Sequence, residues 1–224
     1  MRNQAQTLFL ILSGIFIAAL VSCNLIFQKF FTWSPFGLYT FEISVGIIPY
    51  PITFLVTDII SEIYGRKRAN KVVLAGLISS VFVLGVVLVA NASEATEWSP
   101  VSNSTFSNVF GLTGVAVGAS MIAYLLAQFI DIRVFHFWKR LTKGKYLWLR
   151  NNASTFTSQF MDTATILCLL CLSGGIPWEK FWILLFNGFL FKVIMALIDT
   201  PILYIMVGLI RKKFNLKLNE ELEI

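Results

Sequence analysis

Long apolar stretches, each separated from the next by a short polar segment, occupy most of this chain of 224 residues. A helix that crosses the hydrocarbon core of a bilayer needs about 20 predominantly apolar residues. The pattern therefore predicts six membrane-spanning helices, at residues 7–28, 40–64, 70–91, 109–134, 152–175 and 180–209. Little length remains for a soluble domain, so we expect a single all-α integral membrane domain over residues 1–224.

The second apolar stretch is interrupted by two prolines, Pro49 and Pro51. Proline has no N–H to donate within a helix, so we expect this segment to kink or to start afresh at Pro51. Broken helices at membrane depth commonly line the solute sites of transporters. A kink that serves only helix packing explains the same residues equally well.

Acidic residues lie inside stretches that otherwise have the composition of membrane spans. Asp58 and Glu62 are four residues apart and so project from one face of a helix. A charge at the bilayer centre costs about 3 kcal/mol on insertion scales, so it is retained where it faces a protein interior or a water-filled path. For Glu62, an ion pair with Arg66 or Arg68 explains the residue at least as well as a solute site. Asp58 lies deeper, and we interpret it as a site residue.

The fifth stretch carries the strongest local signal in the chain. Asn152, Thr155, Gln159 and Asp162 recur at steps of three, four and three residues, which places them on one stripe of a helix. Such a stripe is costly in lipid, so we expect it to face the interior of the bundle. Hydrogen bonds between helices account for Asn152 and Thr155, but account less well for Gln159 and Asp162 together.

The last stretch contains a basic and an acidic residue, Lys192 and Asp199, two turns apart on one face. An unpaired ammonium group would be expensive there, so we expect Lys192 to pair with a buried carboxylate. The spacing leaves open whether Lys192 neutralises Asp162 or holds a group of a substrate.

The fourth stretch ends with Asp131 and Arg133, and His136, the only histidine, follows. Because these residues come near the predicted membrane edge, we interpret Asp131 and Arg133 as a solvated interfacial cluster. A proton relay through His136 is the less favoured interpretation.

The net charge of +6 follows the predicted topology. Most of the 18 Lys and Arg residues fall in the segments 66–71, 133–150 and 211–217, whereas residues 91–108 contain two glutamates and no Lys or Arg. By the positive-inside rule, this distribution places both termini in the cytoplasm. The basic surplus therefore reflects membrane orientation, and we expect no nucleic-acid partner.

The chain offers little to an intramembrane enzyme. Cys168 and Cys171 form a CxxC inside an apolar helix without a nearby histidine or second cysteine pair, so we interpret them as buried apolar thiols. No GxxxxGK[ST] motif for nucleotide hydrolysis occurs. We expect no catalytic residue, no metal and no other cofactor.

The polar residues of the spans suit a planar heterocycle as the solute. A carboxylate accepts from the N–H and amino edge of a purine-like base, while an amide side chain satisfies its carbonyl group. Bonds left unmade in such a desolvated site are penalised, which provides selectivity. Other polar heterocycles would fit the same set of side chains.

Three segments resemble the queuosine precursor transporter family, also described as the vitamin-uptake-transporter type. They are residues 49–65 (PYPITFLVTDIISEIYG), 153–163 (ASTFTSQFMDT) and 191–193 (FKV). The resemblance covers nearly the whole chain in length, span layout and motif order. It implies import of 7-deazaguanine precursors of queuosine, preQ0 and preQ1, across the bacterial inner membrane. It also implies a fold similar to the six-helix substrate-binding subunits of energy-coupling-factor importers.

The residues that the resemblance marks for substrate binding coincide with the polar positions of the spans. They are Asp58, Glu62, Asn152, Thr155, Gln159, Asp162 and Lys192. We therefore predict a multi-pass inner-membrane importer without its own ATPase, with a small-molecule substrate and membrane lipid as partners. A homo-oligomer stays open. The alternative is a binding subunit of an energy-coupling-factor importer, which would dock through the small residues Ser13, Gly14, Ala18 and Ala19.

Overall fold

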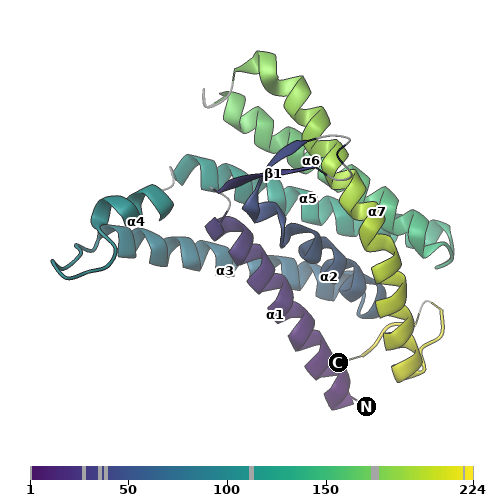
Figure 1. Cartoon of the computed structure of the whole chain (residues 1–224). Helices are drawn as coiled ribbons and strands as arrows, with labels where there is room; N and C mark the ends of the chain where they lie inside the picture. Colours follow the sequence, from purple (N-terminus) through teal and green to yellow (C-terminus); the bar gives the residue numbers. More distant parts are fainter. Residues whose placement is uncertain are drawn as a thin grey trace.

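The computed structural model describes residues 2–26, 29–34, 37, 40–110, 114–172, 177–218 and 220–223. Helices dominate this part of the chain, and one short hairpin of strands accompanies them (Figure 1). In chain order the elements are α1 (Arg2–Ile26), β1 (Phe30–Trp33), β2 (Phe41–Ser44), the 3-10 turn η2 (Val45–Ile47), α2 (Tyr50–Ile63), α3 (Arg66–Ala92), α4 (Asn103–Phe110), α5 (Gly114–Leu141), α6 (Leu147–Leu172), η3 (Trp178–Lys180) and α7 (Phe181–Phe214).

Five helical segments in the described part of the chain are long and apolar enough to cross a membrane. They are Arg2–Ile26, Val45–Ile63, Arg66–Ala92, Met121–Leu141 and Trp178–Phe214. Helix α6 is not among these five, although its 26 residues rise roughly 39 Å, more than the apolar core of about 30 Å. The protein is therefore an all-helical, multi-pass membrane protein, and the count of six spans stays a prediction.

The second predicted span, residues 40–64, is not one continuous helix. It begins with β2, which pairs antiparallel with β1, passes through η2 and becomes α2 at Tyr50. Pro51 lies in the first turn of α2, where its missing N–H leaves no intrahelical bond unmade. The restart expected at Pro51 is confirmed. The strand at its start was not predicted, because a short apolar run reads the same in a strand and in a helix.

Other boundaries also differ from the prediction. The stretch predicted at 109–134 contains the end of α4 at Phe110 and then α5, which continues to Leu141. Helix α6 begins at Leu147 rather than at residue 152. Residues 27, 28, 111–113 and 173–175 of the predicted spans lie outside the described residues.

Helix α2 lies at the centre of the bundle and packs against α1, α3, α5 and α7 (Figure 1). In its span, Val45–Ile63, 61% of residues are buried, against 22% in the spans that contain α3 and α7. Large apolar side chains of α3 and α7, such as Phe82 and Ile205, are instead exposed, as lipid-facing residues would be. The carboxylates of α2 are therefore interior groups.

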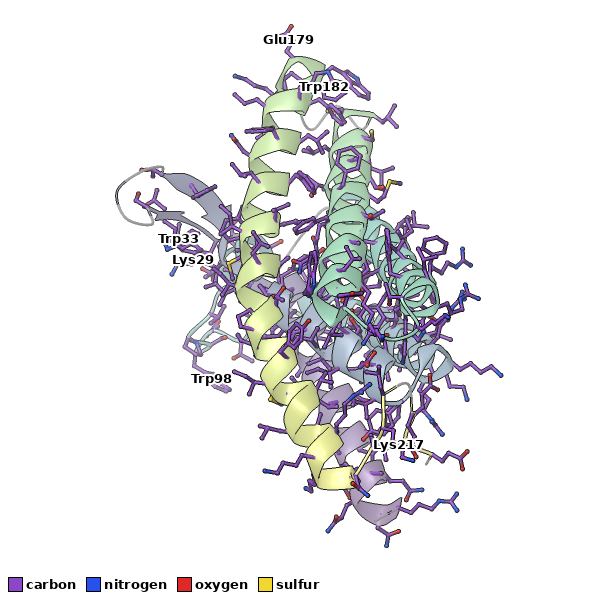
Figure 2. The ribbon with its side chains drawn as sticks, turned by 90° about the vertical axis from the view of Figure 1, so that its right-hand side faces the viewer. Lys29, Trp33, Trp98, Glu179, Trp182 and Lys217 are labelled. Atoms are coloured by element: carbon purple, nitrogen blue, oxygen red, sulfur yellow. The ribbon has the colours of Figure 1, made fainter. Side chains whose placement is uncertain are left out.

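Both ends of the chain lie at the same end of the bundle (Figure 1). Tyr64 Oη donates to the Ala5 carbonyl oxygen at 2.8 Å, and the Leu222 N–H donates to the Ile63 carbonyl oxygen at 2.7 Å. Figure 2 shows Trp182 near one end of α7 and Lys217 beyond its other end. The end of α2 that carries Glu62 thus lies on the side of the two termini.

Candidate functional site

The polar stripe of α6 faces the interior of the bundle, as the spacing predicted. Asn152, Thr155, Gln159 and Asp162 are each at most 8% exposed. A neighbouring position, Ser158, is fully buried as well. Because α6 packs between α5 and α7, this stripe meets polar side chains from both of those helices.

The Asp162 carboxylate is held by two other helices. Its Oδ2 accepts a hydrogen bond from Tyr50 Oη of α2 at 2.7 Å and pairs with Lys192 Nζ of α7. The Lys192 ammonium also lies 4.9 Å from the centre of the Tyr50 ring. The other oxygen, Asp162 Oδ1, is buried without a protein hydrogen-bond partner. The expected pairing of Lys192 with a buried carboxylate is confirmed, and it leaves one acceptor of Asp162 available.

Edge-to-face aromatic contacts join the hairpin to the residue before Lys192. Trp33 and Phe41 of the hairpin contact Phe191 edge-on, at ring-centre distances of 5.6 and 5.5 Å. The hairpin is thereby anchored to α7 immediately before Lys192. Such aromatic contacts add about 0.5–1.5 kcal/mol each beyond the burial of their area.

A cavity of about 220 Å³ lies beside the Asp162–Lys192 pair. Residues of α1, η2, α2, α5, α6 and α7 line it: Leu20, Cys23, Asn24, Gly46, Ile47, Tyr50, Tyr124, Asp162, Ile166 and Lys192. This wall combines apolar and aromatic side chains with a few convergent polar groups, which is typical of small-molecule sites. The volume is below the roughly 300–1,000 Å³ of sites for drug-sized ligands and suits a smaller solute.

A smaller pocket of about 20 Å³ adjoins this cavity through the shared residues Ile47, Tyr50 and Lys192. Its wall includes Thr155, Gln159 and Asp199. The amide oxygen Gln159 Oε1 is buried without a hydrogen-bond partner in the protein. Unsatisfied buried acceptors are rare and costly, so Gln159 in the smaller pocket and Asp162 in the larger cavity each mark a place for a donor.

Asn152 has a different role. Its Nδ2 donates to Thr200 Oγ1 of α7 at 3.0 Å and to the Trp148 carbonyl oxygen at 2.8 Å. Asn152 lines neither of the two adjoining spaces. It therefore joins α6 to α7, as the alternative of hydrogen bonding between helices proposed.

Glu62 is the centre of a buried basic cluster. Its carboxylate pairs with Arg150 of α6 at 2.6 Å, with Lys139 of α5 at 3.4 Å and with Arg211 of α7. These partners replace Arg66 and Arg68, which were the expected partners on the basis of sequence proximity. Glu62 lines neither cavity, and its ion pairs join four helices.

Asp58 faces Asp131 of α5. The two carboxyl groups lie against each other, and they are 2% and 0% exposed. Ser158 Oγ of α6 donates to Asp131 Oδ1 at 3.0 Å. The interpretation of Asp131 as a solvated interfacial residue was wrong, because α2 and α6 cover it. Asp58 is likewise interior but lines neither cavity.

Two polar residues of this interior, Tyr124 and Gln128, were not identified from the sequence. On α5 they precede Asp131 at steps of seven and three residues, and all three are buried. Gln128 Nε2 donates to Tyr124 Oη at 2.6 Å, and Thr57 Oγ1 donates to Gln128 Oε1 at 3.3 Å. The spacing that revealed the stripe of α6 would also have revealed this second stripe.

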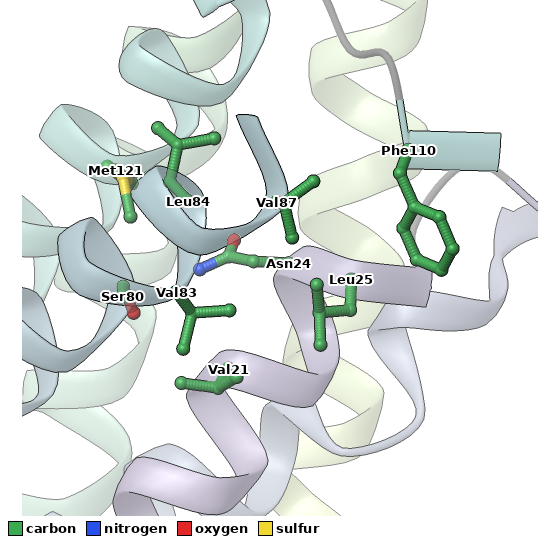
Figure 3. Close-up of a pocket in the computed structure, with 9 residues that line it drawn as sticks. All are labelled: Val21, Asn24, Leu25, Ser80, Val83, Leu84, Val87, Phe110 and Met121. Atoms are coloured by element: carbon green, nitrogen blue, oxygen red, sulfur yellow. The ribbon is translucent and has the colours of Figure 1, made fainter. Parts of the chain in front are cut away.

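A further pocket of about 30 Å³ lies between α1, α3, α4 and α5 (Figure 3). Its lining is apolar apart from Asn24 and Ser80. The lack of charged groups in this lining distinguishes it from the Asp162 cavity, and we regard it as a gap in helix packing.

Long apolar helices that could span a membrane define a multi-pass membrane protein. A family model described as "Putative vitamin uptake transporter" matches residues 44–206, which include α2, α3, α5, α6 and most of α7. The chain belongs to this family.

Three curated relatives have the same kind of name. The chain is 33% identical over 174 residues to a "Probable queuosine precursor transporter" of Bacillus subtilis (strain 168), covering 75% of this chain and 72% of that protein. It is 28% identical over 129 residues to the "Queuosine precursor transporter" of Escherichia coli (strain K12), covering 58% and 55%. A "Probable queuosine precursor transporter" of Haemophilus influenzae (strain ATCC 51907 / DSM 11121 / KW20 / Rd) is 24% identical over 185 residues, covering 81% and 76%. No solved structure gives a significant match.

Proposed function

We propose that this protein imports 7-deazaguanine precursors of queuosine, such as preQ0 and preQ1, across a bacterial inner membrane. The names of its three relatives support this substrate class. The observation that carries the proposal is the Asp162 carboxylate in the cavity wall, with one oxygen held by Tyr50 and Lys192 and the other unpartnered. A fixed acceptor that lacks a donor is the feature that a solute with N–H groups would complete.

The unpartnered acceptors fit the donor edge of a deazaguanine base. Asp162 Oδ1 and Gln159 Oε1 would accept from the ring N–H and the exocyclic amino group. The aromatic ring of Tyr124 and the apolar wall would contact the faces of the base. Because buried acceptors cost free energy when unpaired, a base that lacks these donors would bind more weakly.

The proposed binding set comprises the predicted residues that line the two adjoining spaces: Thr155, Gln159, Asp162 and Lys192. Asn152 supports the set by joining α6 to α7. Asp58 and Glu62, which line neither space, are left out of it. Asp199 enters as a second carboxylate of the smaller pocket and would suit the aminomethyl cation of preQ1.

We further propose that both termini face the cytoplasm. The ends of the chain lie together near the Glu62 end of α2, where the basic segments 66–71 and 211–217 also begin. The positive-inside rule assigns that side to the cytoplasm. The cavity beside Asp162 then lies on the outer side of the Glu62 cluster.

Calorimetric binding of preQ0, preQ1, queuine and guanine to the purified protein in detergent tests the proposal. We expect selective binding of 7-deazaguanines and a loss of at least tenfold in affinity for Asp162→Asn. Gln159→Met, which removes the acceptor at similar size and unchanged charge, should also weaken binding about tenfold, because an unmade hydrogen bond costs about 1–3 kcal/mol.

Thr157→Val is the matched control on the exposed face of the same helix, and it should bind like the wild type. If none of the four compounds binds, the substrate class is refuted. Unchanged affinity in both Asp162→Asn and Gln159→Met would refute the site while leaving the substrate class in place.

A binding subunit of an energy-coupling-factor importer is the second candidate. One observation favours it: Gly14 and Ala18 lie on the exposed face of α1, where another helix could approach closely. Co-purification with an ATPase, together with ATP-dependent uptake, would establish this alternative. Uptake into vesicles that contain the purified chain alone would exclude it.

A further inference from the structure

The two carboxyl groups that face each other across α2 and α5 are unexplained by solute binding. Asp58 and Asp131 are both at most 2% exposed and lie against each other. Two adjacent buried carboxyl groups cannot both ionise readily, because like charges repel in a medium that solvates them poorly. The pair therefore holds at least one proton.

The charged groups around the pair favour this protonated state. Asp131 of α5, Asp199 of α7 and Glu62, one turn further along α2, lie near Asp58, and all three are acids. The buried basic side chains of this region have other partners. Lys139, Arg150 and Arg211 pair with Glu62, and Lys192 pairs with Asp162.

The pair also retains atoms that can take up another proton. Asp58 Oδ1 and Asp131 Oδ2 are buried without a hydrogen-bond partner, whereas Asp131 Oδ1 accepts from Ser158. Ser, Thr, Asn and Gln side chains can join helices in membranes by hydrogen bonds without a change of charge. Two facing aspartates in this position instead supply a site whose charge changes with protonation.

The position of the pair connects it to the cavity. Tyr124 lines the cavity and accepts from Gln128, which in turn accepts from Thr57. Thr57 immediately precedes Asp58, and Gln128 lies one turn before Asp131. On the other side of the pair, the Glu62 cluster leads to the end of the bundle where the termini lie. The pair thus lies between the solute cavity and the proposed cytoplasmic face.

We propose that the Asp58–Asp131 pair is the proton-binding site that couples import to the proton gradient, an inference that rests on the proposed function as an importer. When the cavity opens outward, the singly charged pair binds one further proton at an unpartnered carboxylate oxygen. When the cavity opens inward, that O–H bond breaks and the proton is released to cytoplasmic water. One proton then enters with each solute molecule, and the pair returns to its singly charged state.

Purified full-length protein in liposomes tests the inference with radiolabelled preQ0, which is uncharged and so adds no charge of its own. Exchange of labelled for unlabelled preQ0 at equal pH reports transport alone. Accumulation against a concentration gradient under an inward proton gradient, and acidification of the lumen read by a trapped pH-sensitive dye, report coupling. We expect the wild type to perform all three.

Asp58→Asn and Asp131→Asn should retain exchange and lose at least tenfold in gradient-driven accumulation and in acidification. Each variant keeps the size of the side chain and leaves one carboxylate with a fixed amide neighbour. Glu94→Gln, an exposed acid in the segment between α3 and α4, is the matched control and should behave like the wild type.

The outcomes separate the two hypotheses. Absence of exchange in the wild type, with preQ0 and with preQ1, would refute the proposed function. Wild-type exchange without proton-driven accumulation, or accumulation driven by a sodium gradient, would refute proton coupling while the function stands. Coupled accumulation by both variants would refute the assignment to this pair. Wild-type acidification needs no variant and decides the question of coupling even if the variants fail to fold.

Discussion

Replacing Lys192 with methionine tests whether its buried ion pair with Asp162 holds the helices together or serves only the solute. The side chains of Lys192 and Asp162 are 13% and 2% exposed, so the pair is largely shielded from solvent. Lys192→Met leaves the carboxylate with Tyr50 as its remaining partner. Removing one member of a buried ion pair costs about 3–5 kcal/mol, because the remaining charge is uncompensated.

That cost predicts a measurable change in thermal stability. For a chain of about 150–250 residues, 1 kcal/mol shifts the unfolding midpoint by about 2–4 °C. The midpoint of Lys192→Met should therefore fall by roughly 6–20 °C. Protonation of Asp162 would relieve part of the cost, which places the expected shift in the lower part of that interval.

The double variant Lys192→Met/Asp162→Asn removes both charges and should recover most of the lost stability without recovering preQ0 binding. Tryptophan fluorescence during heating in detergent measures the midpoints, and calorimetry measures binding. Lys180→Met, an exposed lysine before α7, is the control and should unfold with the wild type. A midpoint for Lys192→Met within 2 °C of the wild type, or a double variant as unstable as the single one, would refute the structural role.

Two further predictions concern contacts that only the structure revealed. Tyr50→Phe removes the hydroxyl that donates to Asp162 at 2.7 Å, and a hydrogen bond to a charged group contributes about 1.5–3 kcal/mol, so preQ0 affinity measured by calorimetry should fall about tenfold or more. The control is Tyr204→Phe, which removes a hydroxyl that accepts from the Trp148 N–H. Equal affinities in the two variants would contradict the role of Tyr50 in positioning Asp162. Glu62→Gln leaves the buried basic partners of Glu62 without their shared counterion, so the unfolding midpoint should fall by about 10 °C. The control, Glu179→Gln at an exposed position, should change the midpoint by less than about 2 °C. A Glu62→Gln midpoint equal to that of the control would show that the cluster does not stabilise the bundle.

The sequence by itself determined the features that follow from backbone geometry. The 3.6-residue period of a helix placed Asn152, Thr155, Gln159 and Asp162 on one face, and their burial confirms that expectation. Pro51 predicted the start of α2 within one residue, since the first turn of a helix accommodates proline without losing a hydrogen bond. The length and hydropathy of the apolar segments indicated a membrane protein, because apolar segments of this length are uncommon outside membrane-spanning helices.

Only the tertiary structure decided which charged groups meet. Glu62 pairs with Arg211, 149 residues away, and not with the nearby Arg66 or Arg68. Asp131 is interior because α2 and α6 pack over it, which its position near a predicted span end did not show. The physical reason is that periodicity fixes the direction of a side chain from its own helix, whereas its partner depends on how separate helices pack. That packing turned isolated carboxylates into an ion pair at Asp162, a basic cluster at Glu62 and a carboxyl pair at Asp58.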